Sequence, residues 1–554
     1  MKIVIIGGVA GGASAAARLR RLDENAEIVI IERSGYISYA NCGLPYYLSG
    51  TIEEKESLIL QTPESFKDRF NIDVRVKEEV IEIDRNNKCV KIHQIESDSI
   101  YEESYDKLVL SMGAAAIRPP FPGIDDPRIM TLKTVEDTFR IYEAVKKNVR
   151  NAVVIGGGFI GLEVAENFME TGIDTTMIQL DPQILPQIDY DMAAELHCYL
   201  REKGLKLRLN TAVTGFIPNE TKVEIILNDN TSLSADLIVM AIGVKPESKI
   251  AGDCGIKLNN KGAIIVNEFM QTNDPDVYGV GDAVETYRNI DKARVNVALA
   301  GPANKQGRIA ANHIAGRQTP YGGAQASSII KLFDMTAAST GLTEAAAEQT
   351  NIPYDKVVIY PANHATYYPG AVNMTMKILF HKEKGTILGA QITGFDGVDK
   401  RIDVLATAIR AGMTAGDLTD LDLAYAPPYG SAKDPVNMAG YVIENVLNGT
   451  VEQYHWKEIP SLYEDDNVQF LDVRTPMEYD AGHFKNTIHI PLDELRDNLH
   501  RLDKNKTLYV NCHTGLRSYI ACRILVQHGF KAKNLSGGFR FASFLLEEYI
   551  CGGN

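Results

Sequence analysis

Short apolar runs that end in glycine-rich turns recur along the chain, and they predict buried strands followed by helices. Residues 2–6 read Lys-Ile-Val-Ile-Ile, glycines cluster over residues 7–12, an alanine-rich stretch follows, and residues 28–31 are again apolar. A continuous apolar run, rather than an alternating one, is typical of a strand covered on both faces of a parallel sheet. Residues 1–35 are therefore predicted to form a strand–helix–strand unit.

The same pattern returns in the middle of the chain. Residues 152–178 repeat the order of apolar run, glycine turn, helical stretch and apolar run. Two further apolar runs, within residues 107–114 and 236–243, each end in a turn of small residues. We predict an α/β fold with two Rossmann-like units, because strands that alternate with helices build a parallel sheet.

Both glycine turns have the composition of a dinucleotide-binding site. Glycines let a pyrophosphate approach the N-terminus of the helix, and an acidic residue at the end of the second strand can bind ribose hydroxyls. That acid is Glu32 in the first unit; Gln179 and then Asp181 stand there in the second, so charge leaves the choice between NADH and NADPH open. The candidate nucleotide-binding residues of the two turns are Gly7, Gly8, Ala10, Gly11 and Gly12, and Gly156, Gly158, Ile160 and Gly161.

The composition argues against some classes of partner. The 554 residues carry a formal net charge of −15, whereas nucleic acids and anionic membranes attract basic surfaces. Met1 leads directly into the first strand without the pattern of a signal peptide, and no uninterrupted apolar run reaches the roughly 18 residues of a membrane span. We expect a cytoplasmic protein that binds neither nucleic acid nor a membrane.

Cys42 lies in the stretch Ser-Tyr-Ala-Asn-Cys-Gly-Leu-Pro at residues 38–45, shortly after the first glycine turn. The next cysteine along the chain is Cys89, so Cys42 has no dithiol partner close in sequence. We interpret Cys42 as a single redox-active sulfur that forms its disulfide with a substrate thiol or a distant group. A helix expected over residues 43–48 would favour the Cys42 thiolate through the helix dipole.

A second reactive cysteine is predicted near the end of the chain. Cys512 opens the loop Cys-His-Thr-Gly-Leu-Arg-Ser, in which four residues separate it from Arg517. That is one residue fewer than in related phosphatase loops, which must cradle a phosphate, so sulfur transfer is favoured over phosphate hydrolysis. Backbone N–H groups that converge on Cys512 would stabilise a thiolate and then a persulfide.

The remaining cysteines do not indicate further chemistry. The seven cysteines are odd in number and scattered, which predicts neither a disulfide framework nor a metal site. Apart from the two reactive candidates, we interpret them as core or surface thiols: Cys89, Cys198, Cys254, Cys522 and Cys551.

Residues 277–283, Val-Tyr-Gly-Val-Gly-Asp-Ala, resemble the flavin-contacting turn of two-dinucleotide flavoproteins. With the two glycine turns, this turn makes residues 1–445 similar to the pyridine nucleotide-disulfide reductase family. The resemblance implies FAD in the first unit, NADH or NADPH in the second, and a hydrogen bond from Asp282 to the ribityl chain of FAD. The further nucleotide contacts that it implies are Asn41, Gly113, Gly243, Gly281 and Ala298.

Within that family, residues 38–42, 364–370 and 424–430 are similar to those of coenzyme A disulfide reductases and their persulfide-reducing relatives. The resemblance implies coenzyme A bound as a mixed disulfide. The contacts implied for it are Ser14, Arg18, Arg21, Ser38 and Asn41. A lysine that some relatives place shortly before Ile72 has no match, because Phe70 and Asn71 stand there.

The resemblance also implies a homodimer. Residues 325–447 would form its dimerisation domain and place Tyr367 and Tyr425 near Cys42 of the other subunit. Both tyrosines would be protonated at neutral pH and could donate a proton to a departing thiolate. Tyr368 competes with its neighbour Tyr367 for this role.

Arginines on the first helix form a local basic patch in an acidic protein. Arg18, Arg20 and Arg21 lie there, with Arg33 nearby. Phosphate groups of coenzyme A are natural partners for such a patch, and a solvated helix face is the alternative.

The last part of the chain resembles a rhodanese domain. The resemblance is carried by residues 469–491, by the Cys512 loop and by Gly537-Gly538-Phe539, although the tryptophan often found after the double glycine is missing. The resulting division of the chain is 1–115 and 249–324 for the two segments of the FAD domain, 116–248 for the NAD(P)H domain, 325–447 for dimerisation, 448–456 for a linker and 457–554 for an α/β rhodanese domain.

These observations favour an FAD-dependent, NAD(P)H-driven reductase of coenzyme A disulfide, coenzyme A persulfide or polysulfide. Cys42 would be its redox centre, and Cys512 and Arg517 would handle sulfane sulfur. An NADH oxidase or peroxidase with a Cys42 sulfenic acid is the alternative enzyme, and a flavin-bound redox sensor or sulfur-carrier scaffold is the non-catalytic one. The physiological oxidant and the direction of sulfur transfer between Cys512 and Cys42 are left open.

Overall fold

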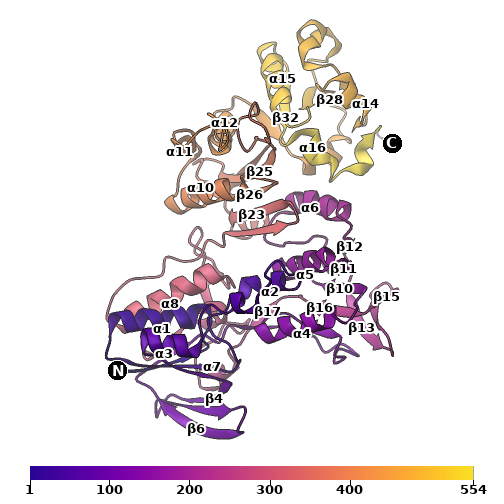
Figure 1. The fold of residues 1–554 in the computed structure, drawn as a ribbon. Coiled ribbons are helices and arrows are strands. Elements are labelled where there is room, and N and C mark those ends of the chain that lie inside the picture. The colour runs from indigo at the N-terminus through magenta and orange to yellow at the C-terminus, as the bar shows by residue number, and fades with distance from the viewer. Residues whose placement is uncertain (553–554) are drawn as a thin grey trace. The chain divides into compact units, whose positions relative to one another are not determined.

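The computed structural model describes residues 1–552 and divides the chain into two compact units (Figure 1). The first unit comprises Met1–Leu185 and Leu200–Ala326. The second comprises Pro186–Tyr199 and Ser327–Asn554. The segment 186–199 therefore packs with a part of the chain that lies more than a hundred residues downstream.

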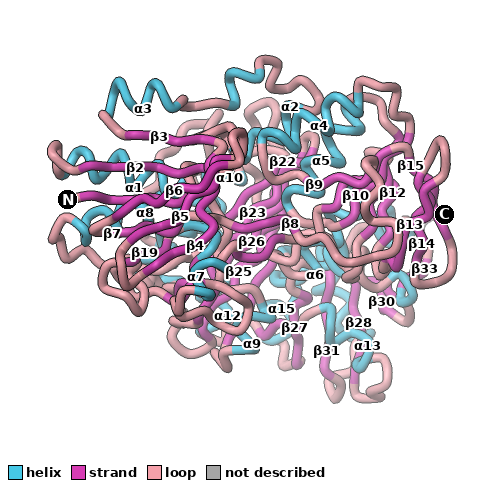
Figure 2. Tube along the Cα trace, turned by 90° about the horizontal axis from the view of Figure 1, so that it is seen from below, coloured by secondary structure: helices cyan, strands magenta, loops and turns pink. Residues whose placement is uncertain are grey.

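The first unit contains the N-terminal parallel sheet, whose strands lie side by side in Figure 2. In spatial order they are β19 (Val277–Gly279), β7 (Lys107–Leu110), β1 (Lys2–Ile6), β2 (Glu27–Glu32) and β3 (Asp73–Val76). All pairings are parallel, and Val4 lies opposite both Val29 and Leu108. From Ile3 to Ile6 the central strand is apolar and buried, because both of its faces are covered, as the apolar run predicts.

Helices α1 (Ala10–Leu22) and α8 (Ala300–Ile314) lie side by side against this sheet, with α3 (Pro63–Phe70) nearby (Figure 1). A Cβ atom at Gly307 of α8 would lie 2.3 Å from the carbonyl oxygen of Gly11 on α1. Because glycine has no Cβ, the two helix backbones can cross in direct contact. Side chains that point away from this crossing therefore come from two helices far apart in sequence.

The first unit also contains a second five-stranded parallel sheet. Its strands, in spatial order, are β12 (Lys206–Arg208), β11 (Asp174–Ile178), β10 (Asn151–Ile155), β16 (Leu237–Met240) and β9 (Ile129–Thr131). Helices α4 (Val135–Val145) and α5 (Phe159–Glu170) belong to it. The prediction of an α/β fold with two Rossmann-like units is confirmed.

Antiparallel pairs extend both parts of the first unit. Near the N-terminal sheet they are β4 (Glu78–Asp84), β5 (Cys89–Gln94) and β6 (Ser99–Ser104), and β20 (Val284–Tyr287) with β21 (Arg294–Val295). Near the second sheet they are β13 (Val213–Pro218), β14 (Val223–Leu227) and β15 (Ser232–Ala235). The chain passes between the two parallel sheets at β8 (Ala114–Ala116) and β17 (Val244–Pro246), which pair with each other.

The second unit begins with an antiparallel sheet. Its strands, in spatial order, are β22 (Ser328–Leu332), β23 (Met335–Gly341), β26 (Ile387–Gly394), β25 (Met374–His381) and β24 (Tyr354–Ile359). Its helices are α9 (Glu344–Gln349), α10 (Val398–Ala411), α11 (Ala415–Thr419) and α12 (Pro435–Leu447). The start of α6 (Tyr190–Glu202) belongs to this unit as well.

A five-stranded parallel sheet follows in the same unit. Its strands, in spatial order, are β27 (Glu452–Tyr454), β32 (Lys531–Leu535), β31 (Thr507–Asn511), β28 (Val468–Asp472) and β30 (Thr487–His489). Helices α14 (Pro476–Asp480), α15 (Leu516–Gln527) and α16 (Gly538–Ser543) belong to it. Because β27 is its edge strand, residues 448–456 are not only a linker; they include part of the C-terminal sheet.

The helices are short for a membrane protein. The longest one described, α8, has 15 residues, whereas a bilayer span needs about 20 apolar residues. Among residues 1–552, no helix combines the length and the apolar character needed to cross a membrane.

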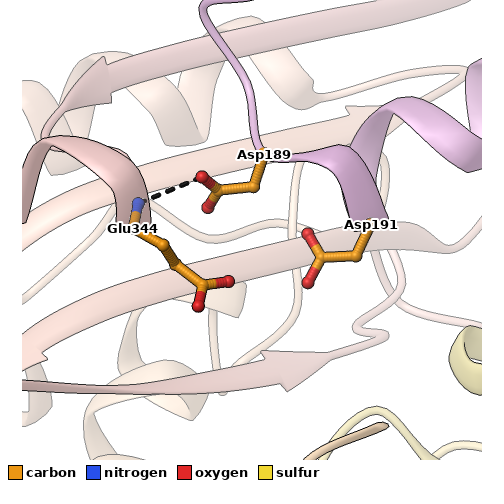
Figure 3. Close-up of side chains that lie close together, drawn as sticks. All are labelled: Asp189, Asp191 and Glu344. Carbon is orange, nitrogen blue, oxygen red and sulfur yellow. Dashed lines mark hydrogen bonds between the residues drawn. The ribbon is translucent and has the colours of Figure 1, made fainter. Parts of the chain in front are cut away.

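A buried ammonium group ties the second unit together. Figure 3 shows Asp189, Asp191 and Glu344 with their carboxylates turned toward one another, close enough to suggest a metal site. The Lys377 Nζ occupies that position: it lies 2.9 Å from Asp189 Oδ2 and 2.6 Å from Asp191 Oδ1, and it also donates to Glu344. Lys377 is fully buried, and burial opposes its charge, but the three carboxylates outweigh burial and raise the pKa of Lys377.

The same ion cluster also contacts the 3-10 turn Trp456–Glu458, which follows β27 of the C-terminal sheet. The Trp456 indole Nε1 donates to Asp191 Oδ2 at 3.1 Å, and the Glu344 backbone N–H donates to Asp189 Oδ1 at 3.0 Å (Figure 3). Lys377 therefore joins β25, α9, the segment before α6 and the entry to the last domain in one ion cluster.

We expect Lys377→Met to destabilise the second unit by about 3–5 kcal/mol, because Asp189 and the buried Asp191 would lose their cation. Glu344 would keep only its pairs with Lys356 and Lys457. Hydrogen–deuterium exchange of peptides from residues 354–381, followed by mass spectrometry, measures this loss in the full-length protein. Lys382→Met is the matched control, since Lys382 follows the same strand with an exposed side chain. Equal protection in both variants would show that the cluster does not stabilise this unit.

Candidate active site

The first glycine turn brings backbone atoms into contact at the end of β1. Gly7 has φ +96°, and a Cβ atom there would lie 2.2 Å from the Ser111 carbonyl oxygen. A Cβ atom at Gly12 would lie 1.9 Å from the Gly7 carbonyl oxygen. Helix α1 then begins after Val9 with no side-chain cap and no acidic residue in its first turn. Its first N–H groups therefore remain available to an anion, which fits the pyrophosphate of a dinucleotide.

Glu32 completes this turn from the end of β2. The carboxylate is buried, and Glu32 Oε2 accepts a hydrogen bond of 2.9 Å from the Gly8 N–H. Glu32 Oε1 accepts one of 2.9 Å from the Ser34 N–H. An acid held in this way fits the ribose-binding position that the sequence predicts.

The second glycine turn repeats the geometry of the first. Gly156 has φ +110°, and a Cβ atom there would lie 2.3 Å from the Ala241 carbonyl oxygen; one at Gly161 would lie 1.9 Å from the Gly156 carbonyl oxygen. Helix α5 also begins without a side-chain cap, after Gly158, where a Cβ atom would meet nothing within 4 Å. This turn has the free N–H groups and the open space that a second nucleotide requires.

Gln179 takes the position that Glu32 has in the first unit. Its Oε1 accepts a hydrogen bond of 2.8 Å from the Gly157 N–H, and its Nε2 donates to Asp181 Oδ2 at 3.0 Å. The second site therefore has a neutral amide at the end of the strand and a carboxylate beside it. Choice between NADH and NADPH stays open.

The predicted flavin-contacting turn is held from several directions. The Gly281 N–H donates to Gln306 Oε1 at 2.8 Å, and Asp282 Oδ2 pairs with Lys133 Nζ at 3.2 Å. The Asn296 amide donates to the Asp282 carbonyl at 3.0 Å. Lys133 and Gln306 are residues that the sequence did not single out, because neither belongs to a recognisable motif.

The other predicted nucleotide contacts occupy turns or helix starts. Gly113 and Gly243 both have positive φ and lie next to the paired strands β8 and β17. Ala298 is exposed shortly before α8, and Asn41 lies in the turn that carries Cys42.

Cys42 lies in a 3-10 turn, Asn41–Gly43, and is exposed as a residue. The sequence predicts a helix over residues 43–48 whose dipole would lower the pKa of Cys42. The helix found there, α2 (Leu44–Tyr47), has only four residues, which is too short for that effect. Partial burial of the sulfur raises the pKa of Cys42, with further raising by Glu163 and Asp282 and an opposing effect of Lys133. A thiolate at Cys42 therefore needs help from a bound group.

Glu163 is the titratable residue near Cys42 that the sequence did not predict. It projects from α5, and its Oε1 accepts a hydrogen bond of 3.3 Å from the Tyr46 hydroxyl on α2. Burial raises the pKa of Glu163 to about 7. The helix of the second nucleotide turn thus contributes a carboxyl group beside the reactive cysteine of the first.

The coenzyme A candidates lie on α1 and in the loop before Cys42. Ser14 hydrogen-bonds Asn304 of α8, Arg18 Nε donates to Asn312 Oδ1 at 3.0 Å, and Ser38 has the positive φ of 43°. Arg21 lies at the end of α1 and is exposed. Two of them, Ser14 and Arg18, therefore contact α8.

Two members of the expected basic patch already have partners within the chain. Arg20 is 5% exposed, and its guanidinium donates to the carbonyls of Phe70 at 2.7 Å and Asn71 at 2.9 Å, the residues where some relatives have a lysine. Arg33 pairs with Glu247 at 2.7 Å. Arg20 is therefore not available to a phosphate, whereas the Arg33 side chain stays 52% exposed beside its partner.

Helix α8 and the residues after it supply other arginines in their place. Arg308 and Arg317 are exposed and lie close enough to Arg18 to lower its pKa, after the larger effect of burial. In the described part of the chain, no carboxylate pairs with Arg18, Arg21, Arg308 or Arg317. The sequence could not show this cluster, because α1 and α8 are about three hundred residues apart.

The two predicted tyrosines form a pair in the second unit. The hydroxyls of Tyr367 and Tyr425 lie 2.8 Å apart, and this hydrogen bond raises the pKa of Tyr425. The Tyr367 side chain is 74% exposed. Tyr368 instead packs its ring edge against His364, so Tyr367 is the residue that can act together with Tyr425.

Cys512 is buried at the end of β31, and its sulfur accepts two hydrogen bonds. They come from the Gly515 N–H at 3.1 Å and from the Ser518 hydroxyl at 3.3 Å. The Phe539 N–H, at the start of α16, donates to the Cys512 carbonyl at 2.8 Å and holds the loop. This environment fits a sulfur that must carry negative charge, as the loop sequence predicts.

Arg517 follows at the start of α15 and pairs with Glu478 of α14. Arg517 Nη1 lies 2.8 Å from Glu478 Oε2, and Arg517 Nη2 lies 2.6 Å from Glu478 Oε1. The cation of the loop is therefore neutralised within the chain.

Three family models match the chain. They are the pyridine nucleotide-disulphide oxidoreductase over residues 1–307, its dimerisation domain over residues 327–435 and the rhodanese-like domain over residues 456–540. The expected resemblance to this family and to a rhodanese domain is confirmed.

The relatives extend the match to the whole chain. Over 443 residues, 79% of this chain and 99% of the relative, the sequence is 37% identical to the coenzyme A disulfide reductase of Staphylococcus aureus strain JH9. The crystal structure of reduced CoADR-RHD from Bacillus anthracis has a TM-score of 0.97 and 45% identity, with 99% of each chain covered. The NAD-dependent persulfide reductase of A. fulgidus has a TM-score of 0.91 and 38% identity, covering 98% of this chain and 100% of that one.

With two nucleotide turns, an antiparallel dimerisation sheet and a Cys512 loop in one chain, this protein belongs to the pyridine nucleotide-disulphide oxidoreductase family and is an oxidoreductase with a C-terminal rhodanese-like domain.

Proposed function

We propose that the protein uses FAD and NADH or NADPH to reduce coenzyme A disulfide, coenzyme A persulfide or polysulfide at Cys42, in the cytoplasm. The observation that carries this proposal is the setting of Cys42, which is exposed beside the flavin-contacting turn. All seven cysteines are free in the structure, so the chain offers Cys42 no disulfide partner. A disulfide at Cys42 then has to be formed with an external thiol.

The cofactor sites fit this proposal through the features of the two turns. The uncapped starts of α1 and α5 offer N–H groups to two pyrophosphates, and Glu32 and Gln179 mark the ribose positions. When bound, FAD would carry the two electrons of a hydride from the nicotinamide to sulfur. The chain's own residues orient the groups: Asp282 and Lys133 at the flavin turn, and Glu163 next to Cys42.

Reduction of the mixed disulfide between Cys42 and coenzyme A consumes two electrons and one proton. The S–S bond breaks, Cys42 keeps one electron pair as a thiolate, and coenzyme A leaves as a thiol once it is protonated. We assign the proton to the Tyr367–Tyr425 pair of the partner subunit in a homodimer. The hydrogen bond between the hydroxyls lets one tyrosine stabilise the other as the proton leaves.

Coenzyme A fits the arginine cluster on the first unit. Arg18, Arg21, Arg308 and Arg317 lack carboxylate partners in the described residues, and phosphate oxygens would complete their hydrogen bonds. Ser38 and Asn41 would position the thiol end near Cys42. At the rhodanese domain, Cys512 would carry sulfane sulfur as a persulfide that the Gly515 N–H and the Ser518 hydroxyl stabilise.

We expect the purified protein to carry a coenzyme A adduct on Cys42 that NADH plus a mild thiol removes and that Cys42→Ser lacks. Intact mass spectrometry before and after reduction measures the adduct. Cys254→Ser is the control, because that thiol lies away from the flavin turn and donates to the Ala251 carbonyl. An added mass of only one or two oxygen atoms would point instead to the NADH oxidase or peroxidase alternative.

Arg308→Met should raise the KM for coenzyme A disulfide by about 10-fold, because a charge-assisted hydrogen bond to a phosphate is lost. Steady-state reduction of coenzyme A disulfide and of pantethine, which has the same thiol arm without the nucleotide phosphates, separates the effect. Arg308→Met should leave the KM for pantethine at the value of the unmodified protein. Arg69 is an exposed arginine of α3, and Arg69→Met should leave the KM for both substrates unchanged. A rise in KM for both disulfides would argue against a phosphate contact.

Tyr425→Phe should lower kcat for coenzyme A disulfide by about 100-fold, as expected for a lost proton donor. Stopped-flow measurement should show that NADH reduces the flavin at an unchanged rate, since this step does not involve the tyrosines. Tyr368→Phe is the neighbouring control and should keep full activity. If Tyr425→Phe turns over at the rate of the unmodified protein, the proton comes from another group.

A further inference from the structure

The cation of the Cys512 loop, Arg517, has its partner within the chain. Arg517 makes a two-pronged ion pair with Glu478, and Glu478 Oε2 also accepts hydrogen bonds from the Thr475 N–H at 2.9 Å and the Thr475 hydroxyl at 2.8 Å. The hydrogen bond from Arg517 is the largest influence that lowers the pKa of Glu478 to about 2. The stabilisation from this pair is complete above the ordinary pKa of glutamate and is lost only as the pH falls toward 2. The pair is therefore intact at neutral pH.

The other arginines around the loop are also paired. Arg474 is 2% exposed, and its Nη2 lies 2.7 Å from Asp472 Oδ2. Arg540 Nη2 donates to Glu195 Oε1 at 3.1 Å. Arg540 belongs to α16, whose first N–H groups donate to the carbonyls of Cys512 and His513. The same three arginines and Glu478 are the charged groups that act on His513 within the loop. Each positive charge at the loop is matched by a carboxylate.

The paired arginines around the Cys512 loop differ from the arginine cluster on and after α1 and α8. There, Arg18, Arg21, Arg308 and Arg317 have no carboxylate partners among the described residues. A surface prepared for a multiply charged anion is thus present in this chain, and it is not at Cys512.

The residues beside the ion pair are apolar and open to solvent. Met477 precedes Glu478 and is 81% exposed, and Leu516 precedes Arg517 and is 62% exposed. Each member of the ion pair thus has an exposed apolar neighbour in the sequence, a thioether at Met477 and a hydrocarbon at Leu516. Such a surface favours an organic group over a small dianion.

We propose that Cys512 accepts sulfane sulfur from organic persulfides and discriminates against thiosulfate, and that Glu478 sets this specificity by holding Arg517. The inference rests on the proposed sulfur-carrying role of Cys512. The Cys512 thiolate attacks the outer sulfur of a persulfide R–S–SH. A bond forms between Cys512 and that sulfur, the donor S–S bond breaks, and the thiolate R–S⁻ leaves with the bonding pair while the proton stays on the transferred sulfur.

Thiosulfate, by contrast, would transfer its outer sulfur to Cys512 and release sulfite as the leaving group. Both thiosulfate and sulfite carry two negative charges, which need a cation at the mouth of the loop. Arg517 cannot serve that purpose while Glu478 binds both of its terminal nitrogens. An organic persulfide carries at most one charge on its sulfane sulfur and has a hydrocarbon arm that can lie against Met477 and Leu516.

The test compares donors on the full-length holoenzyme. Pantetheine persulfide, whose arm carries no charge, should load Cys512 with one sulfur atom, as measured by peptide mass spectrometry. Thiosulfate should load it with a kcat/KM at least about 10-fold lower, on the scale of one charge-assisted ion pair. This comparison uses the unmodified protein and does not depend on the folding of any variant.

Glu478→Gln should then lower the KM for thiosulfate by about 10-fold with little change in kcat, because it frees the Arg517 guanidinium. The kcat/KM for pantetheine persulfide should stay within about 3-fold, since that donor does not need the cation. Glutamine can still accept the hydrogen bonds that cap α14. Glu494→Gln, an exposed carboxylate of the 3-10 segment Leu492–Arg501, is the matched control and should change neither donor.

Equal loading from thiosulfate and persulfide in the unmodified protein would overturn the inference and leave the sulfur-carrying role of Cys512 intact. An unchanged KM for thiosulfate in Glu478→Gln would do the same. Failure of both donors to load Cys512 would overturn the inference together with the proposed role of this domain.

Discussion

Both nucleotide sites depend on backbone atoms that touch where no side chain would fit. At Gly7 with Gly12, and again at Gly156 with Gly161, an added Cβ atom would lie about 2 Å from a carbonyl oxygen. This contact sets the start of each helix against the end of a strand and leaves its first N–H groups free. Glu163 lies on α5, which begins at the second turn, and Cys42 follows the strand–helix–strand unit that contains the first turn. The positions of both residues therefore depend on these close backbone contacts.

The two candidate reactive sulfurs have different surroundings. The chain itself provides Cys512 with hydrogen bonds from Gly515 and Ser518, in a buried loop. Cys42 is exposed, and its protein surroundings raise its pKa. Stabilisation of a thiolate at Cys42 thus has to come from a bound cofactor or substrate, which suits a centre that works only when both are present.

Charge is used in three distinct ways in this protein. At Lys377 a buried ammonium group is surrounded by carboxylates and joins segments of the second unit. Around Cys512, each arginine is matched by a carboxylate, so that the loop has no spare cation. Near α1 and α8, Arg18, Arg21, Arg308 and Arg317 have no carboxylate partner among residues 1–552. The same side-chain type is therefore paired in one place and unpaired in another.

The sequence by itself determined the α/β class, the two nucleotide turns, Cys42, the Cys512 loop and the family, because glycine turns and apolar runs are local patterns that short-range sterics dictate. Only the tertiary structure showed Glu163 beside Cys42, Lys133 at Asp282, Arg308 beside Arg18 and the pair of Tyr367 with Tyr425. It also showed that Arg20 is buried and that α2 is too short to lower the pKa of Cys42. These features join residues far apart in sequence, and their contacts arise when helices and sheets pack, which no local pattern encodes.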